Sequence, residues 1–83
     1  MKTFVEKRLV QIRSIADDIG AFISCDIYYD DLRLARGEHF VVRLHGHSFV
    51  GDIDVHYRTA SIRRSLNMAL AYMKRLKNPG HTR

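Results

Sequence analysis

Residues 38–57, EHFVVRLHGHSFVGDIDVHY, decide the fold, because their side chains alternate twice between apolar and polar, with a glycine between the two runs. Such alternation is typical of a β-strand with one face on a core, and two runs this close together predict a β-hairpin. The apolar positions are Phe40, Val42 and Leu44 in the first run and Phe49, Ile53 and Val55 in the second.

The turn of this hairpin is predicted at Gly46-His47, because a two-residue turn with glycine first suits the twist of paired strands. In that register, Gly51 faces the first strand and indicates a bulge or a close backbone contact. The turn sets the following residues opposite one another: Leu44 and Phe49, Val42 and Gly51, Phe40 and Ile53, His39 and Asp54, and Val41 and Asp52.

Further elements flank the hairpin on both sides. Residues 3–19 place an apolar side chain every three or four positions, which predicts an α-helix that ends at Gly20. Residues 21–29 alternate again and predict the first strand, while residues 32–37 fit either a loop or a short edge strand. After the hairpin, Thr59 or Ser61 is expected to cap a second helix, which ends before Pro79.

The predicted fold is a single domain over residues 1–83, an α+β two-layer sandwich with the order helix, three-stranded antiparallel sheet, helix (αβββα). Each helix has one apolar stripe and the sheet has one apolar face, so we expect both helices on one sheet face. The other face is then exposed. It carries, in this prediction, Ser24, Asp26, Tyr28, His39, Val41, Arg43, Val50, Asp52, Asp54 and His56.

Charge is distributed unevenly along the chain, whose formal net charge is +5. The last 29 residues hold seven Lys and Arg and no acid, whereas residues 21–57 hold six acids and three bases. Like charges gathered on one element attract anions. The residues predicted to bind nucleic acid or another anionic partner are Arg58, Arg63, Arg64, Lys74, Arg75 and Lys77.

Two of these cations carry most of the argument. Arg63 and Arg64 fall at the start of the last helix, where a positive charge opposes the helix dipole by roughly a few tenths of a kcal/mol. Lys74, Arg75 and Lys77 fall near its end, where cations are favourable in any helix. An unfavourable placement favours a functional explanation, and Arg63 and Arg64 are therefore the stronger indication.

The predicted exposed sheet face mixes apolar and acidic side chains, which favours a protein partner or a homodimer over nucleic acid. The residues of this predicted protein interface are Tyr28, Val41, Arg43, Val50, Asp52 and Asp54.

Catalytic and metal-binding chemistry find little support in the sequence. Four histidines surround the hairpin, namely His39, His45, His47 and His56, but the pattern supplies no further metal ligand close by. It also lacks an activated nucleophile, an oxyanion hole and a Gly-rich phosphate loop. We therefore expect neither an enzyme, a metal site nor a cofactor, and leave open a metal- or pH-responsive dimer that uses these histidines.

The cellular setting follows from the single cysteine and the charged N-terminal segment. Cys25 is the only cysteine, so no disulfide forms within the chain and a reducing compartment is expected. Charges interrupt every apolar run, which predicts neither a signal peptide nor a membrane span. We expect a cytoplasmic protein without membrane contact.

The order of helix, three strands and helix is similar to that of the double-stranded-RNA-binding domain. That family contacts A-form RNA through its first helix, the loop between its first two strands, and basic residues that open its last helix. Residues 37–40 and the pair Arg63-Arg64 fall in the corresponding regions. Residues 54–59, DVHYRT, stand where the family has a glycine-rich turn, and Asp30-Asp31 makes the loop acidic, so the likeness covers element order.

These observations predict a small, non-catalytic binding protein whose basic last helix is directed at nucleic acid or a nucleoprotein complex. The alternative is an inhibitor or adaptor of the phage or mobile-element type. Such a protein binds a protein target, for example a nucleic-acid-handling defence complex, through its charged helix or its exposed sheet face. This alternative rests on small size and absence of recognisable chemistry, by analogy.

Overall fold

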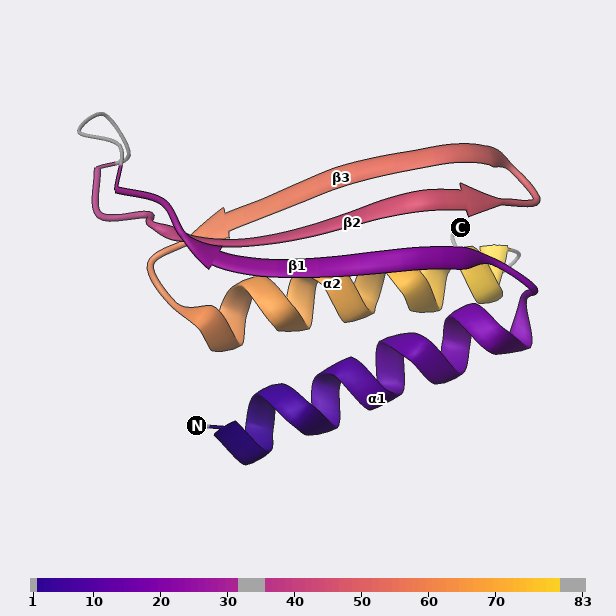
Figure 1. Cartoon of the computed structure of the whole chain (residues 1–83), viewed down its shortest axis with the longest axis horizontal. Helices are drawn as coiled ribbons and strands as arrows, with labels where there is room; N and C mark the ends of the chain where they lie inside the picture. The colour runs from indigo at the N-terminus through magenta and orange to yellow at the C-terminus, as the bar shows by residue number, and fades with distance from the viewer. Residues whose placement is uncertain (1, 32–35, 80–83) are drawn as a thin grey trace.

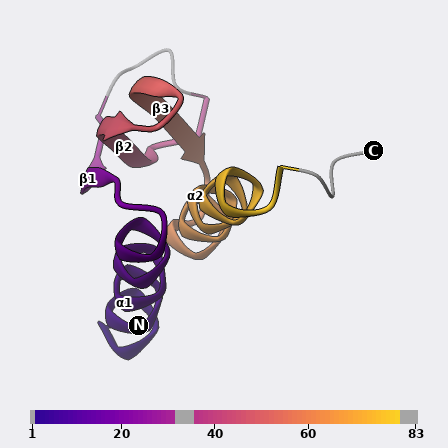
Figure 2. The ribbon, with the colours of Figure 1, turned by 90° about the vertical axis from the view of Figure 1, so that its right-hand side faces the viewer.

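The computed structural model describes residues 2–31 and 36–79 and confirms the predicted order and layers. Helix α1 (Lys2–Asp18) precedes an antiparallel sheet of order β1-β2-β3, and helix α2 follows it. Figures 1 and 2 show both helices on the same side of the sheet. The bounds of the remaining elements are Phe22–Tyr29 for β1, Phe40–Ser48 for β2, Gly51–Thr59 for β3 and Ile62–Lys77 for α2.

Helix α1 ends as its sequence predicts. Gly20 has a φ of 67°, which an L side chain rarely adopts. The Ala21 N–H donates to the Ala16 carbonyl at 2.9 Å and the Gly20 N–H donates to the Asp17 carbonyl at 3.2 Å. These two bonds form a Schellman motif, which satisfies the last carbonyls of the helix and turns the chain into β1.

The predicted hairpin register is wrong. The turn lies at Phe49-Val50, so that Ser48 pairs with Gly51, Leu44 with Val55, and Gly46 with Ile53 inside the ladder. The Ser48 side chain supports this turn, because its Oγ accepts a bond from the Val50 N–H at 3.2 Å. Because the chain reverses later than predicted, β2 and β3 each have nine residues. The longer ladder pairs more backbone N–H and C=O groups than a hairpin with its turn at Gly46 would pair.

Gly46 serves a close backbone contact instead of a turn. A Cβ built at this position would lie 1.9 Å from the Phe22 carbonyl oxygen, far inside contact distance. Glycine is therefore required at this position, where β1 pairs closely with β2. Gly51, for which a bulge or close contact is predicted, has no atom within 4 Å of such a Cβ and occupies the hairpin end.

The predicted inward positions that lie within β2 and β3 nevertheless keep their face. Phe49, which was predicted to face the core, is the exception, because it lies in the turn and is 65% exposed. Leu44 pairs with Val55 instead of Phe49, a shift of an even number of residues, and an even shift leaves every side chain on its own face. Val42 and Leu44 are fully buried under the helices. The buried cluster consists of Ile12, Ala16, Ala21, Val42, Leu44, Leu66, Ala69, Leu70 and Met73.

A buried polar network attaches α2 to the sheet. Ser61 caps the helix, and its Oγ accepts a bond from the Arg64 N–H. Behind it the Ser65 hydroxyl, which is fully buried, lies 2.7 Å from Thr59 Oγ1 and donates to the Phe40 carbonyl at 2.8 Å. Satisfied buried hydrogen bonds of this kind are costly to break, so they hold the start of α2 in place.

The segment 32–37, for which a loop or a short edge strand is predicted, falls mostly outside the described residues. Arg36 and Gly37 form a turn with positive φ, and the Asp30 N–H donates to the His39 carbonyl as the β1–β2 ladder continues.

Candidate anion-binding surface

The two helices lie parallel and in register, which brings their N-termini to the same end of the molecule. Arg8 of α1 donates from Nε to Asn67 of α2 at 2.9 Å, and Lys77 near the end of α2 pairs with Asp18 at the end of α1. Figure 1 shows both helices starting at the same end of the molecule, where β1 ends and β2 begins. Neither helix has an acidic residue in its first turn, so two positive dipole ends face the same region.

Two arginine side chains pack on one aromatic ring at this end of the molecule. The Arg8 guanidinium lies 4.4 Å from the centroid of the Phe4 ring, and the Arg63 guanidinium lies 4.3 Å from it. Both distances are those of cation–π contacts. Arg64 follows Arg63 and is exposed. We call the group formed by Phe4, Arg8, Arg63 and Arg64 the basic end.

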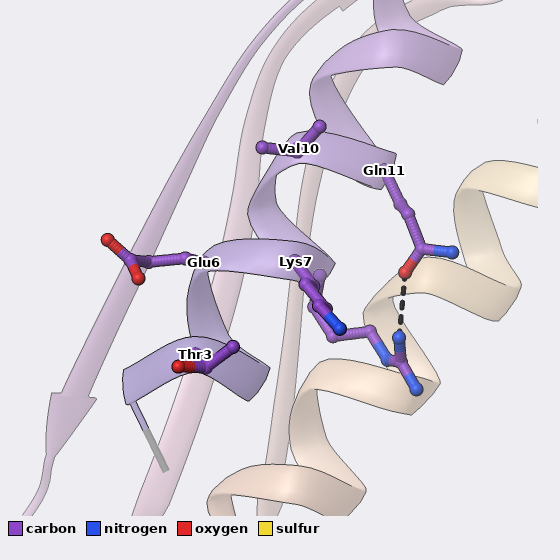
Figure 3. A pocket seen from close by; sticks show the side chains of 6 residues that line it. Thr3, Glu6, Lys7, Val10 and Gln11 are labelled. Atoms are coloured by element: carbon purple, nitrogen blue, oxygen red, sulfur yellow. Dashed lines mark hydrogen bonds between the residues drawn. The ribbon is translucent and has the colours of Figure 1, made fainter.

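Hydrogen bonds to neutral groups orient Arg8 within the basic end. Arg8 donates to Gln11 Oε1 at 2.8 Å in addition to its bond to Asn67. Figure 3 shows Gln11 pointing toward α2 and Glu6 pointing to the opposite side of α1. Because these partners are neutral, they do not compensate the positive charge of the guanidinium.

None of the ion pairs among the described residues includes a residue of the basic end. They join Arg43 to Asp54, Arg58 to Asp30, Lys77 to Asp18 and three histidines to aspartates. The positive charge of Arg8, Arg63 and Arg64 is therefore not cancelled by a carboxylate within the described ranges. An electropositive surface with free guanidinium donors suits phosphate or carboxylate groups.

Only two of the six predicted anion-binding cations, Arg63 and Arg64, belong to this surface. Lys74, Arg75 and Lys77 lie at the opposite end of α2, where Lys77 is engaged by Asp18. Burial raises the pKa of the Tyr57 phenol, and Arg75 beside its hydroxyl offsets part of this rise.

Arg58 lies on the far face of the sheet and covers Val41. Its guanidinium pairs with Asp30 at 2.5 Å and donates to the Glu38 carbonyl at 3.2 Å. Val41, which stands between Tyr28 and Arg58 in the ladder, is only 1% exposed. The prediction that Val41 is exposed is therefore wrong, because a long side chain from the next strand reaches across it.

Sequence reasoning missed Phe4 and Arg8. The available signal is their spacing of four residues, which places both on one face of a helix. Their relation to Arg63 has no local signal, because 55 residues separate Arg8 from Arg63. Only the parallel packing of α1 against α2 brings them together.

The open sheet face is a surface of matched charges. Arg43 donates from Nε and from a terminal nitrogen to the two carboxylate oxygens of Asp54, each at 2.9 Å. This bidentate contact lowers the pKa of Asp54 and raises that of Arg43. His45 lies 3.0 Å from Asp26, and His47 lies 2.5 Å from Asp52.

Two residues predicted for this face, His39 and Val50, have surroundings other than those predicted. His45 stands opposite Asp54, and His39 instead contacts the Asp30 carbonyl at 2.7 Å and stacks on the Tyr29 ring. Val50 belongs to the hairpin turn, where it is exposed, and does not contribute to the sheet face. Of the predicted interface set, Tyr28, Arg43, Asp52 and Asp54 lie on the open face.

Cys25 is a poor nucleophile in this environment. Burial first, and the charge of Asp26 second, raise the pKa of its thiol from 9.0 to about 11. We therefore expect iodoacetamide at about pH 8 to alkylate Cys25 roughly 100-fold more slowly than an exposed thiol, because the thiolate fraction is that much smaller. The rate should rise with pH, and Asp26→Asn should accelerate it. Reaction as fast as that of glutathione would contradict the assignment.

Within the described ranges, no group of three or more His, Cys, Asp or Glu side chains is placed to hold a metal ion. None of the described helices is both long enough and apolar enough to cross a membrane. Comparison with models of protein families, with curated proteins and with solved structures finds no match to this chain. The fold and its surface therefore define the class, a small two-layer αβββα domain with a basic end.

Proposed function

We propose that this protein is a non-catalytic binding module that docks its basic end on the phosphates of nucleic acid, alone or within a nucleoprotein complex. The observation that carries the proposal is the contact of Arg8 and Arg63 with one Phe4 ring, 4.4 and 4.3 Å from its centroid. Two cations held this close repel one another, and an anion placed between or beside them relieves that repulsion.

Two features of the surroundings support a phosphate ligand in particular. The dipoles of two helices point their positive ends at the region, and backbone N–H groups at helix starts are suited to phosphate oxygens. Guanidinium groups bind phosphates in a bidentate manner, and both Arg63 and Arg64 are exposed. The open sheet face, with its internally paired charges, is left for other contacts.

The test is a binding titration with labelled double-stranded RNA, double-stranded DNA and single strands at a low and a moderate salt concentration. The decisive variant is Arg63→Glu/Arg64→Glu. The matched control is Lys74→Glu/Arg75→Glu, which makes the same change of four charge units at the other end of the same helix. Circular dichroism first establishes that both variants are folded.

We expect the wild-type protein to bind at least one form in a salt-sensitive manner, because counterions are released from the phosphates. The Arg63/Arg64 variant should bind about 10- to 100-fold more weakly, with a smaller salt slope, whereas the control should change by less than about threefold. Absence of binding at low salt, or equal losses in the two variants, would refute the proposal. Pull-down would then address the protein-target alternative.

A further inference from the structure

Strand β1 has a free edge that is unusually open to pairing. It is the first strand in the sheet order, and within residues 2–31 and 36–79 only β2 pairs with it. Edge strands are normally protected by lysine, proline or a bulge. The β1 sequence FISCDIYY contains neither lysine nor proline and has Asp26 as its only charge. Phe22 is 82% exposed and Tyr29 is 58% exposed.

The backbone groups at this edge belong to the inward-facing residues. The Asp30 N–H donates to the His39 carbonyl, so Asp30 makes a hydrogen-bonded pair with β2. Hydrogen-bonded pairs recur at every second residue of an antiparallel ladder. The N–H and C=O groups of Ile23, Cys25 and Ile27 therefore point away from β2 and toward the free edge.

The core is also incompletely closed beneath β1. Ile23, Cys25 and Ile27 face the helices but are only half-buried, because α2 lies under β2 and β3 while α1 packs more on α2 than on β1. A groove remains between α1 and β1, and Val10 on its helix side is 66% exposed. The residues that line this groove are Leu9, Val10, Ile12, Arg13, Ile23, Ser24 and Cys25.

We propose that β1 of a second copy of this chain pairs antiparallel with β1, which makes one continuous sheet across a two-fold axis. The strand is self-complementary about Cys25. A two-fold axis at this residue sets Cys25 opposite Cys25, Ser24 opposite Asp26, Ile23 opposite Ile27 and Phe22 opposite Tyr28 of the second copy. Apolar residues then meet apolar residues, and a hydroxyl meets a carboxylate.

The neighbouring registers lack this complementarity. An axis at Asp26 sets two carboxylates directly opposite one another, which is destabilising, and an axis at Ser24 sets Phe22 opposite Asp26. In the register centred on Cys25, the isoleucines of the second copy extend over the groove and cover Ile23. The outward backbone groups of the two strands also find partners in each other.

This dimer is distinct from association through the open sheet face, and its test exchanges charges at Phe22 and Tyr28, which stand opposite one another across the two-fold axis. Phe22 and Tyr28 are both exposed in the monomer, at 82% and 42%, so polar substitutions there leave the core intact. One variant is Phe22→Lys/Tyr28→Lys and the other is Phe22→Asp/Tyr28→Asp. The matched control is Phe49→Lys/Val50→Lys, which introduces the same charge on exposed apolar residues of the hairpin turn.

Sedimentation equilibrium over a wide range of protein concentration measures the result. The wild-type and control proteins should dimerise, and each β1 variant should dimerise at least about tenfold more weakly because like charges stand opposite one another. An equimolar mixture of the two β1 variants should restore the dimer through opposite charges. A wild-type protein that stays monomeric, a dimer that both β1 variants leave unchanged, or a mixture without rescue would overturn the proposal.

Discussion

Replacing Gly46 with alanine is expected to destabilise the protein by roughly 2 to 6 kcal/mol, from about 1–3 of backbone strain and about 1–3 of overpacking. The new Cβ would lie 1.9 Å from the Phe22 carbonyl oxygen, and Gly46 has a φ of 153°. The three nearest atoms are backbone atoms of Phe22 and Ile23 in the paired strand β1, which cannot move without breaking the ladder. A chain of 83 residues has a total stability of about 4 to 12 kcal/mol, so a large part is lost.

Chemical denaturation monitored by circular dichroism measures this loss. The matched control is Gly20→Ala, because Gly20 also has a positive φ but no atom within 4 Å of a Cβ. The control isolates the cost of conformation, which is about 1 kcal/mol, from the cost of the clash. Equal effects of the two substitutions would show that the approach of Phe22 to Gly46 is not as close as described.

Replacing Leu66 with alanine is the second large effect that we expect, about 2 to 5 kcal/mol of lost stability. Leu66 is fully buried in α2 and belongs to the cluster that joins the helices to the sheet. Its truncation removes apolar area and leaves a cavity that rigid neighbours fill only partly. Because α2 carries Arg63 and Arg64, loosening the helix should also weaken the binding that we propose for the basic end.

Thermal and urea unfolding of Leu66→Ala measure the change, with Met68→Ala as the matched control. Met68 lies two residues further along the same helix and is 42% exposed, so its truncation should cost less than about 1 kcal/mol. A similar loss in the two variants would contradict the assigned core. A saturating ligand would recover part of the stability of either variant, because it binds only the folded state.

The comparison of stability and binding variants separates structure from recognition. Substitutions at Gly46 and Leu66 act through packing and should lower stability whether or not a ligand is present. Substitutions at Arg63 and Arg64 act on exposed side chains and should leave stability nearly unchanged. A loss of binding without loss of stability therefore identifies the basic end as a contact surface.

The faces of the strands could be read from the sequence, whereas the hairpin register could not. Alternation depends on neighbouring residues in one strand, so Val42, Leu44 and Ile53 were predictable as core. Register depends on where the chain reverses. Gly46 resembles a turn glycine, but it lies within the ladder, where the backbone of Phe22 approaches so closely that no side chain fits. Nothing in residues 44–48 distinguishes the two uses.

The candidate site divides in the same way. Arg63 and Arg64 could be selected from the sequence as candidates for anion binding, because their charge opposes the dipole of a helix whose start is marked by Ser61. The gathering of six cations on one surface was not a reliable expectation. A helix of 16 residues separates Arg63 from Lys77 by several turns, and Arg58 belongs to a strand that presents it on the opposite face.

Hydrophobic periodicity and capping act over a few residues, and the elements, their inward faces and the helix ends could therefore be predicted from local patterns. Contacts between residues far apart in the chain depend instead on how the elements pack. This packing placed Arg8 and Arg63 on one Phe4 ring, laid Arg58 over Val41, and left β1 as an open edge beside α1. These relations arise from the packing of whole elements against one another, and no local pattern records them.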